Sequence, residues 1–77
     1  MRYPLEERRL VARAELRRNM ELHQMTMGTL AKRLNMTRQT LSRRMREPEN
    51  LTVDELRLTS KALELSDQQI LRIVKGG

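Results

Sequence analysis

The sequence contains no cysteine, no tryptophan and no phenylalanine, and its 77 residues include one histidine, three glycines and two prolines. Without cysteine there is neither a disulfide nor a thiolate metal site, and His23 alone cannot form a histidine cluster. No apolar run approaches the roughly 18 residues of a membrane helix, and the N-terminus lacks the apolar segment of a signal peptide. The sequence predicts a cytoplasmic protein that needs no cofactor or metal and does not enter membranes.

Residues that commonly perform catalysis are also scarce. There is no cysteine nucleophile, no second histidine and no glycine-rich loop for phosphates. The serine and threonine hydroxyls are better explained as helix caps. We therefore expect that the protein is not an enzyme.

Positive charge is concentrated in the first part of the chain. Residues 1–46 contain 12 Lys/Arg and 4 Asp/Glu, a balance of +8, whereas residues 47–77 contain 4 and 6, a balance of −2. A basic region of this kind favours a polyanionic partner. Because Tyr3 is the only aromatic residue, stacking platforms for single strands are missing, and double-stranded DNA is the expected partner.

The composition and the capping signals predict an all-α fold. Leu, Met, Glu, Arg and Gln are abundant, while β-branched and aromatic residues are scarce. Thr26 and Thr37 are placed as N-caps, and Thr52 to Glu55 and Ser66 to Gln69 have the form of capping boxes. We expect five helices in one domain over residues 1–77: 5 to about 22–24, 27 to about 34, 38 to about 46, 53 to about 65, and a last one that begins after Ser66.

The second and third of these helices form a predicted helix-turn-helix over about residues 26–46. Their caps stand eleven residues apart, so the connection is too short for parallel packing and the helices must cross steeply. Ala31 provides the small side chain that such a crossing needs, and Asn35 can adopt the left-handed conformation of a tight helix end. The methionines at positions 20, 25, 36 and 45 are expected to fill the core.

Polar residues share the outward face of the predicted helix 38–46. With Leu41 directed to the core, a turn of 100° per residue places Gln39 at about 160°, Arg43 at about 200°, Arg46 at about 140° and Ser42 at about 100°. Arginine pairs with guanine and glutamine with adenine through two hydrogen bonds each. This helix is therefore predicted to lie in the major groove, with its N-terminal residues at the base edges.

The first helix carries arginines at four-residue intervals, Arg9, Arg13 and Arg17. Two interpretations are open. The arginines could form a solvated face with local ion pairs such as Arg17–Glu21, or they could contact the DNA backbone.

Residues 25–46 resemble the Cro and phage-repressor type of helix-turn-helix regulator, the XRE-like family, and the resemblance extends to about residue 71. Its specific part consists of Leu30, Ala31, Leu34, Met36, Thr37, Leu41, Ser42 and Arg43. The resemblance implies a five-helix, lambda-repressor-like fold. It also implies base-reading positions for Arg38, Gln39 and Arg43, contacts to backbone or bases by Thr40 and Ser42, and a phosphate near Thr26 and Met27. Together with the helix face and the helix start, we expect base contacts by Arg38, Gln39, Ser42 and Arg43, and backbone contacts by Thr26, Met27, Thr29, Thr40 and Arg46. The sequence departs from the family pattern at Met27, usually polar, at Asn35, usually glycine, and at Arg44, usually apolar; Glu47, Pro48 and Glu49 replace the usual glycine.

The last helix carries Ile70, Leu71, Ile73 and Val74, and together these residues form an apolar surface wider than one core-facing stripe. We expect a homodimer contact through Ile70, Ile73 and Val74. The predicted function is that of a sequence-specific transcriptional regulator, a repressor of phage, mobile-element or toxin–antitoxin type. The alternative is a helix-turn-helix scaffold whose basic face binds an acidic protein partner.

Overall fold

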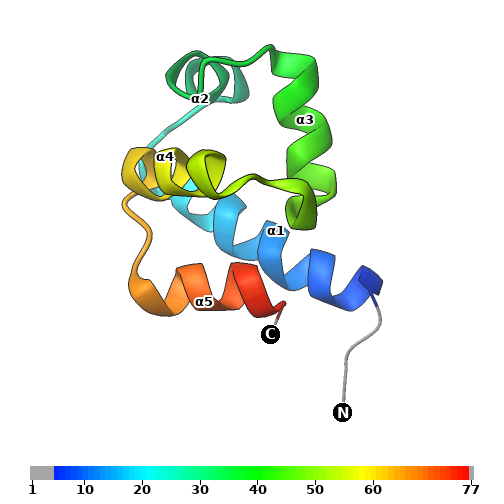
Figure 1. Cartoon of the computed structure of the whole chain (residues 1–77). Helices are drawn as coiled ribbons and strands as arrows, with labels where there is room; N and C mark the ends of the chain where they lie inside the picture. The colour runs from blue at the N-terminus through cyan, green and yellow to red at the C-terminus, as the bar shows by residue number, and fades with distance from the viewer. Residues whose placement is uncertain (1–4, 77) are drawn as a thin grey trace.

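The computed structural model describes residues 5–76, which form five α-helices and one short 3-10 helix and contain no strand. The elements are α1 (Leu5–Leu22), α2 (Met27–Arg33), α3 (Arg38–Arg46), η1 (Pro48–Asn50), α4 (Val53–Leu63) and α5 (Asp67–Lys75). Figure 1 shows α5 lying along α1, while α2 and α3 cross steeply at the opposite end of the molecule. The predicted all-α, five-helix fold with a helix-turn-helix is confirmed.

The starts of α2, α3, α4 and α5 are fixed by hydroxyl caps, as predicted. Thr26, Thr37, Thr52 and Ser66 each accept a hydrogen bond from the backbone N–H three residues later. Such a bond satisfies one of the N–H groups that a helix start leaves unpaired. At α4 and α5 the Glu55 and Gln69 side chains complete the boxes by accepting from the cap residue's own N–H.

The connection between α2 and α3 depends on one left-handed residue. Asn35 has φ 55°, as its sequence position indicates, and its backbone N–H donates to the Lys32 carbonyl. Sequence reasoning did not identify two other left-handed residues, Gln24 at φ 51° after α1 and Glu64 at φ 52° after α4. These three sharp endings turn the chain within a few residues and bring the short helices together.

One apolar core joins all five helices. Leu30, Leu34 and Leu41 of the helix-turn-helix are buried, and the four methionines expected in the core pack against it, half-buried. Leu16, near the middle of α1, is fully buried in this core. The buried apolar residues are Ala12, Leu16, Leu30, Ala31, Leu34, Leu41, Leu63 and Ile73.

A polar network connects α1 with α4 and α5. Asn19 Nδ2 donates to the Leu63 carbonyl at 2.8 Å, and Asn19 Oδ1 accepts from Gln69 Nε2 at 2.7 Å. Glu15 accepts from Gln69 Nε2 at 3.1 Å and from Arg72 Nη1 at 3.0 Å. Glu15 and Asn19 are buried in α1, yet their polar atoms are hydrogen-bonded, so their burial is not penalised.

Several residues lie differently from their expected positions in the last two helices. Val53, an apolar residue at the start of α4, is 67% exposed, and α4 ends at Leu63, so Leu65 lies beyond the helix that was expected to reach about residue 65. Ile73, expected at a dimer contact, is only 7% exposed because it completes the core. Helix periodicity alone could not assign these positions, because the direction of a short helix is set by the elements that it packs against.

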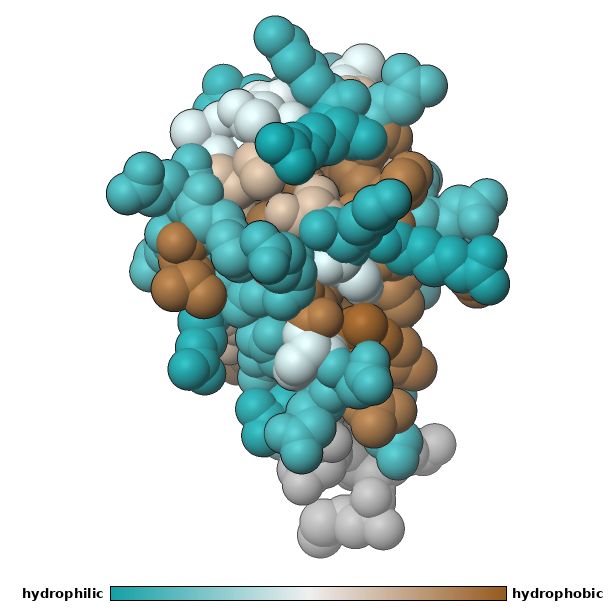
Figure 2. Space-filling view, turned by 90° about the vertical axis from the view of Figure 1, so that its left-hand side faces the viewer, coloured by the Kyte–Doolittle hydropathy of each residue, from teal (hydrophilic) through white to brown (hydrophobic). Residues whose placement is uncertain are grey.

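The face shown in Figure 2 is predominantly hydrophilic, and most of its apolar residues lie along its right-hand side, with a smaller apolar group at the left. None of the helices over residues 5–76 combines the length and the apolar character that crossing a membrane requires. The large apolar side chains with the highest exposure include Leu5, Leu10, Leu22, Val53, Leu58, Leu71 and Val74.

Candidate nucleic-acid interface

The two helices of the helix-turn-helix begin with the same arrangement of paired hydroxyls. Thr26 Oγ1 accepts from the Thr29 backbone N–H at 3.1 Å and lies 3.0 Å from Thr29 Oγ1. Thr37 and Thr40 repeat this geometry, at 3.1 and 2.9 Å. In each hydroxyl pair one proton lies between the two oxygens, and the other is left to donate outward. Each helix start thus offers a donor of the kind that binds phosphate oxygens.

The outward face of α3 matches the angles predicted from the sequence. Leu41 is 1% exposed, whereas Arg38, Gln39 and Arg43 on other sides of the helix are exposed. Arg46 is exposed as well, and Ser42 is half-buried at the side of the helix. The helix therefore presents a row of side chains that can donate and accept hydrogen bonds toward a groove of DNA.

Arg44 does not belong to this outward row. Its Nε donates to Glu55 Oε1 at 3.0 Å, and both side chains are partly buried between α3 and α4. The Thr52 backbone N–H and, second, Arg44 lower the pKa of the Glu55 carboxyl. The arginine at this position thus fixes α3 to the start of α4, and its charge is neutralised within the protein.

Met27, predicted to approach a phosphate, has its side chain packed against the core. It is half-buried, so the thioether is not directed freely toward a ligand. What Met27 can offer outward is its backbone N–H in the first turn of α2, which has no partner within the helix. The departure from the family pattern at this position is therefore explained by packing.

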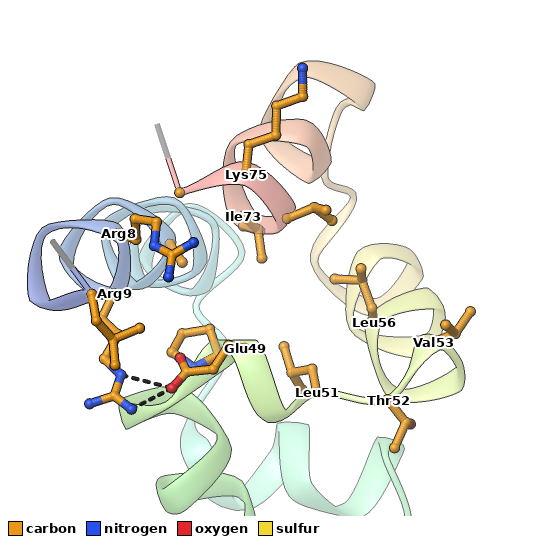
Figure 3. A pocket seen from close by; sticks show the side chains of 14 residues that line it. Arg8, Arg9, Glu49, Leu51, Thr52, Val53, Leu56, Ile73 and Lys75 are labelled. Carbon is orange, nitrogen blue, oxygen red and sulfur yellow. Dashed lines mark hydrogen bonds and ion pairs between the residues drawn. The ribbon is translucent and has the colours of Figure 1, made fainter. Parts of the chain in front are cut away.

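The arginines of α1 have different environments. Arg9 Nε donates to Glu49 Oε2 at 2.9 Å, and its Nη2 contacts the same oxygen (Figure 3). This clasp holds α1 to η1 and, chiefly through its hydrogen bond, lowers the pKa of the Glu49 carboxyl. Arg13 and Arg17 are absent from the ion pairs of residues 5–76, and the expected Arg17–Glu21 pair does not form. The example pair is thus wrong, while the exposed position of Arg17 leaves both the solvated face and the DNA-backbone contact open.

A groove between α1 and the helix-turn-helix brings part of the predicted site together. Its apolar lining consists of Met20, Met25, Met27 and Met45, and we call it the methionine groove. The predicted contact residues Thr26, Met27, Ser42 and Arg46 line it, whereas Arg38, Gln39, Arg43, Thr29 and Thr40 lie outside it. Arg13 and Arg17 also line it. Sequence analysis singled out these two arginines through their four-residue spacing but did not choose between their two interpretations.

Comparison with family models identifies the family of the chain. Residues 16–70 match the model described as Helix-turn-helix. The match covers most of the chain, so the chain belongs to this helix-turn-helix family of DNA-binding regulators, of the Cro-like or XRE type. Searches of curated proteins and of solved structures found no match.

Proposed function

We propose that the protein is a sequence-specific binder of double-stranded DNA that acts as a transcriptional repressor by occupying a promoter. The observation that carries this proposal is the exposed polar face of α3, in a chain of the helix-turn-helix family. In the proposed complex α3 lies in the major groove, with Arg38, Gln39, Ser42 and Arg43 at the base edges. The backbone contacts come from Thr26, Met27, Thr29, Thr40 and Arg46.

Occupancy of a promoter requires only binding to DNA, which is the activity that the helix-turn-helix over residues 16–70 supports. Phage immunity, control of a mobile element and autoregulation by an antitoxin are three settings in which such a repressor works. We place the protein in the cytoplasm, on the chromosome. An acidic protein partner for the basic face is the alternative that the experiment below distinguishes.

We further propose that the repressor binds DNA as a homodimer through α5. The residues that support this are Leu71 and Val74, which are 52% and 64% exposed, with half-buried Ile70 beside them. Ile73 is removed from the predicted contact because it lies in the core. Val74 also lines a mainly apolar hollow of about 340 Å³ between α1, α4 and α5, which Leu51, Leu56 and Ile73 line as well (Figure 3).

Selection of bound duplexes from a random pool at near-physiological salt tests both proposals. Two inverted half-sites with centres about 10 base pairs apart would support a dimeric repressor. One unpaired motif would support sequence-specific binding and contradict the symmetric dimer. No enrichment would contradict sequence-specific binding and favour the protein partner.

The roles of individual side chains are tested on the selected site. We expect Arg43→Ala, and likewise Gln39→Ala, to weaken binding to the preferred duplex by about 1–3 kcal/mol and to flatten base preference at one position. The reason is that a lost base contact penalises the correct base most. Fluorescence anisotropy with preferred and random duplexes measures both effects. Equal weakening on the two duplexes would contradict the assignment to bases.

A further inference from the structure

The methionine groove has two polar rims. Arg13, Arg17 and Glu21 come from α1, and Ser42 and Arg46 come from α3. The volume of the groove is about 640 Å³. The groove is therefore open to a ligand that lies between α1 and α3, which we call the recognition helix because it is the helix proposed to enter the major groove.

Positive charge exceeds negative charge around this groove. The other arginines that pack between elements are paired, Arg9 with Glu49, Arg44 with Glu55 and Arg72 with Glu15. By contrast, the ion pairs of residues 5–76 do not include Arg13, Arg17 or Arg46. Glu21 is the one acidic residue that lines the groove. Three guanidinium groups against one carboxylate favour an anionic occupant.

We propose that Arg13 and Arg17 of α1, with Arg46 of α3, form a phosphate-binding track that holds one DNA strand beside the recognition helix. The proposal rests on the proposed function, because the track shares Thr26, Ser42 and Arg46 with the proposed DNA contacts. A strand that passes Ser42 on its way out of the major groove reaches the α1 rim next. Duplex DNA thus contacts a helix outside the helix-turn-helix.

The spacing of the two arginines suits a sugar–phosphate backbone. Residues four apart in a helix are separated by about 6 Å along its axis, while one strand of duplex DNA carries a phosphate about every 3.4 Å along the duplex axis. Two successive arginines on one helix side can therefore bind different phosphates of the same strand. The methionine side chains between the rims are flexible and apolar, and they adapt to the sugar carbons between phosphates.

The salt dependence of binding tests the track. Neutralising one phosphate contributes roughly 0.9 to the slope of log affinity against log salt. We expect the double variant Arg13→Gln, Arg17→Gln to make this negative slope less steep by about 1.8. The variant should also weaken binding to the selected duplex and to a random duplex by the same factor. Anisotropy titrations across a range of salt concentrations measure both quantities.

The matched control is the double variant Arg18→Gln, Arg57→Gln. It removes the same charge from two exposed arginines, one on α1 and one on α4, that do not line the groove. We expect its slope to remain near that of the unaltered protein. Circular dichroism confirms that both variants are folded.

Two outcomes would overturn the track. If both double variants change the slope equally, general charge explains the effect; if neither does, the groove is left to another anionic ligand. In either case the proposed function still holds if the unaltered protein shows a base preference and the Gln39→Ala variant loses it. Failure of the unaltered protein to discriminate among duplexes would instead contradict the proposed function itself.

Discussion

Asn35 occupies the position between α2 and α3 where the backbone turns in the left-handed region, at φ 55°. A β-carbon is disfavoured there, and asparagine tolerates the conformation better than most residues. Glycine has no β-carbon and adopts it without that strain. The angle between the two helices of the helix-turn-helix therefore depends on a residue that is adequate but not optimal.

We expect Asn35→Gly to raise the free energy of unfolding by up to about 1 kcal/mol and Asn35→Ala to lower it by about 1 kcal/mol. Asn35 is exposed, so neither change creates a cavity. Urea unfolding followed by circular dichroism gives both values. If the two substitutions shift stability in the same direction, backbone strain does not explain this position.

At the scale of elements, α5 is attached to α1 by a hydrogen-bonded network as well as by apolar contact. The carboxylate of Glu15 is at its centre, and the Gln69 hydrogen bond and then Arg72 lower its pKa below the ordinary value of 4.5. Because the folded state holds this group deprotonated more strongly than the unfolded state does, the stabilisation is present above about pH 4.5. It is lost as the pH falls through the lowered pKa.

We expect the protein to lose stability below about pH 4.5 and the Glu15→Gln variant to lose less over the same interval. At neutral pH the variant should already be less stable by about 1 kcal/mol, because the charge facing Arg72 is gone. Urea unfolding between about pH 3 and 7 measures the difference. Glu7→Gln, an exposed change on the same helix outside the network, serves as the control. If the free energy of unfolding of the Glu15→Gln variant changes with pH in parallel with that of the unaltered protein, the role of Glu15 is contradicted.

The sequence predicted the elements more completely than their packing. Hydroxyl caps depend on residues three positions apart, so Thr26, Thr37, Thr52 and Ser66 could be recognised without tertiary information. The burial of Asn19 and Glu15 could not be predicted in this way. Polar residues are expected at the surface unless a distant residue, here one on α5, forms hydrogen bonds with them.

The candidate site was predictable to a similar extent. The outward position of Gln39 and Arg43 follows from the helix angle once Leu41 is placed inside. The partner of Arg44 on another helix, and the position of Arg17 at the rim of a groove, depend on how the helices are placed relative to one another. One-dimensional patterns carry little of that information.

For the molecule as a whole, the exposed apolar residues Leu71 and Val74 on α5 predict that two copies of the chain form a dimer. We expect a dimer at tens of micromolar in analytical ultracentrifugation and a monomer after Val74→Lys, because a charge would lie in the contact. The variant should remain folded, since Val74 is largely exposed. Leu58→Lys, at an exposed position of α4, is the control and should leave the dimer intact. If the unaltered protein is a monomer both with and without DNA, the proposed dimer is wrong.

The independence of the α3 surface from the rest of the fold affects how such a protein can change over generations. The side chains of Arg38, Gln39 and Arg43 are exposed and are not among the hydrogen-bonded or ion-paired side chains of residues 5–76. Surface substitutions of this kind usually alter stability by less than about 0.5 kcal/mol. With the base contacts proposed above, a lineage can therefore acquire a new target sequence by single replacements at these positions, with every intermediate still folded.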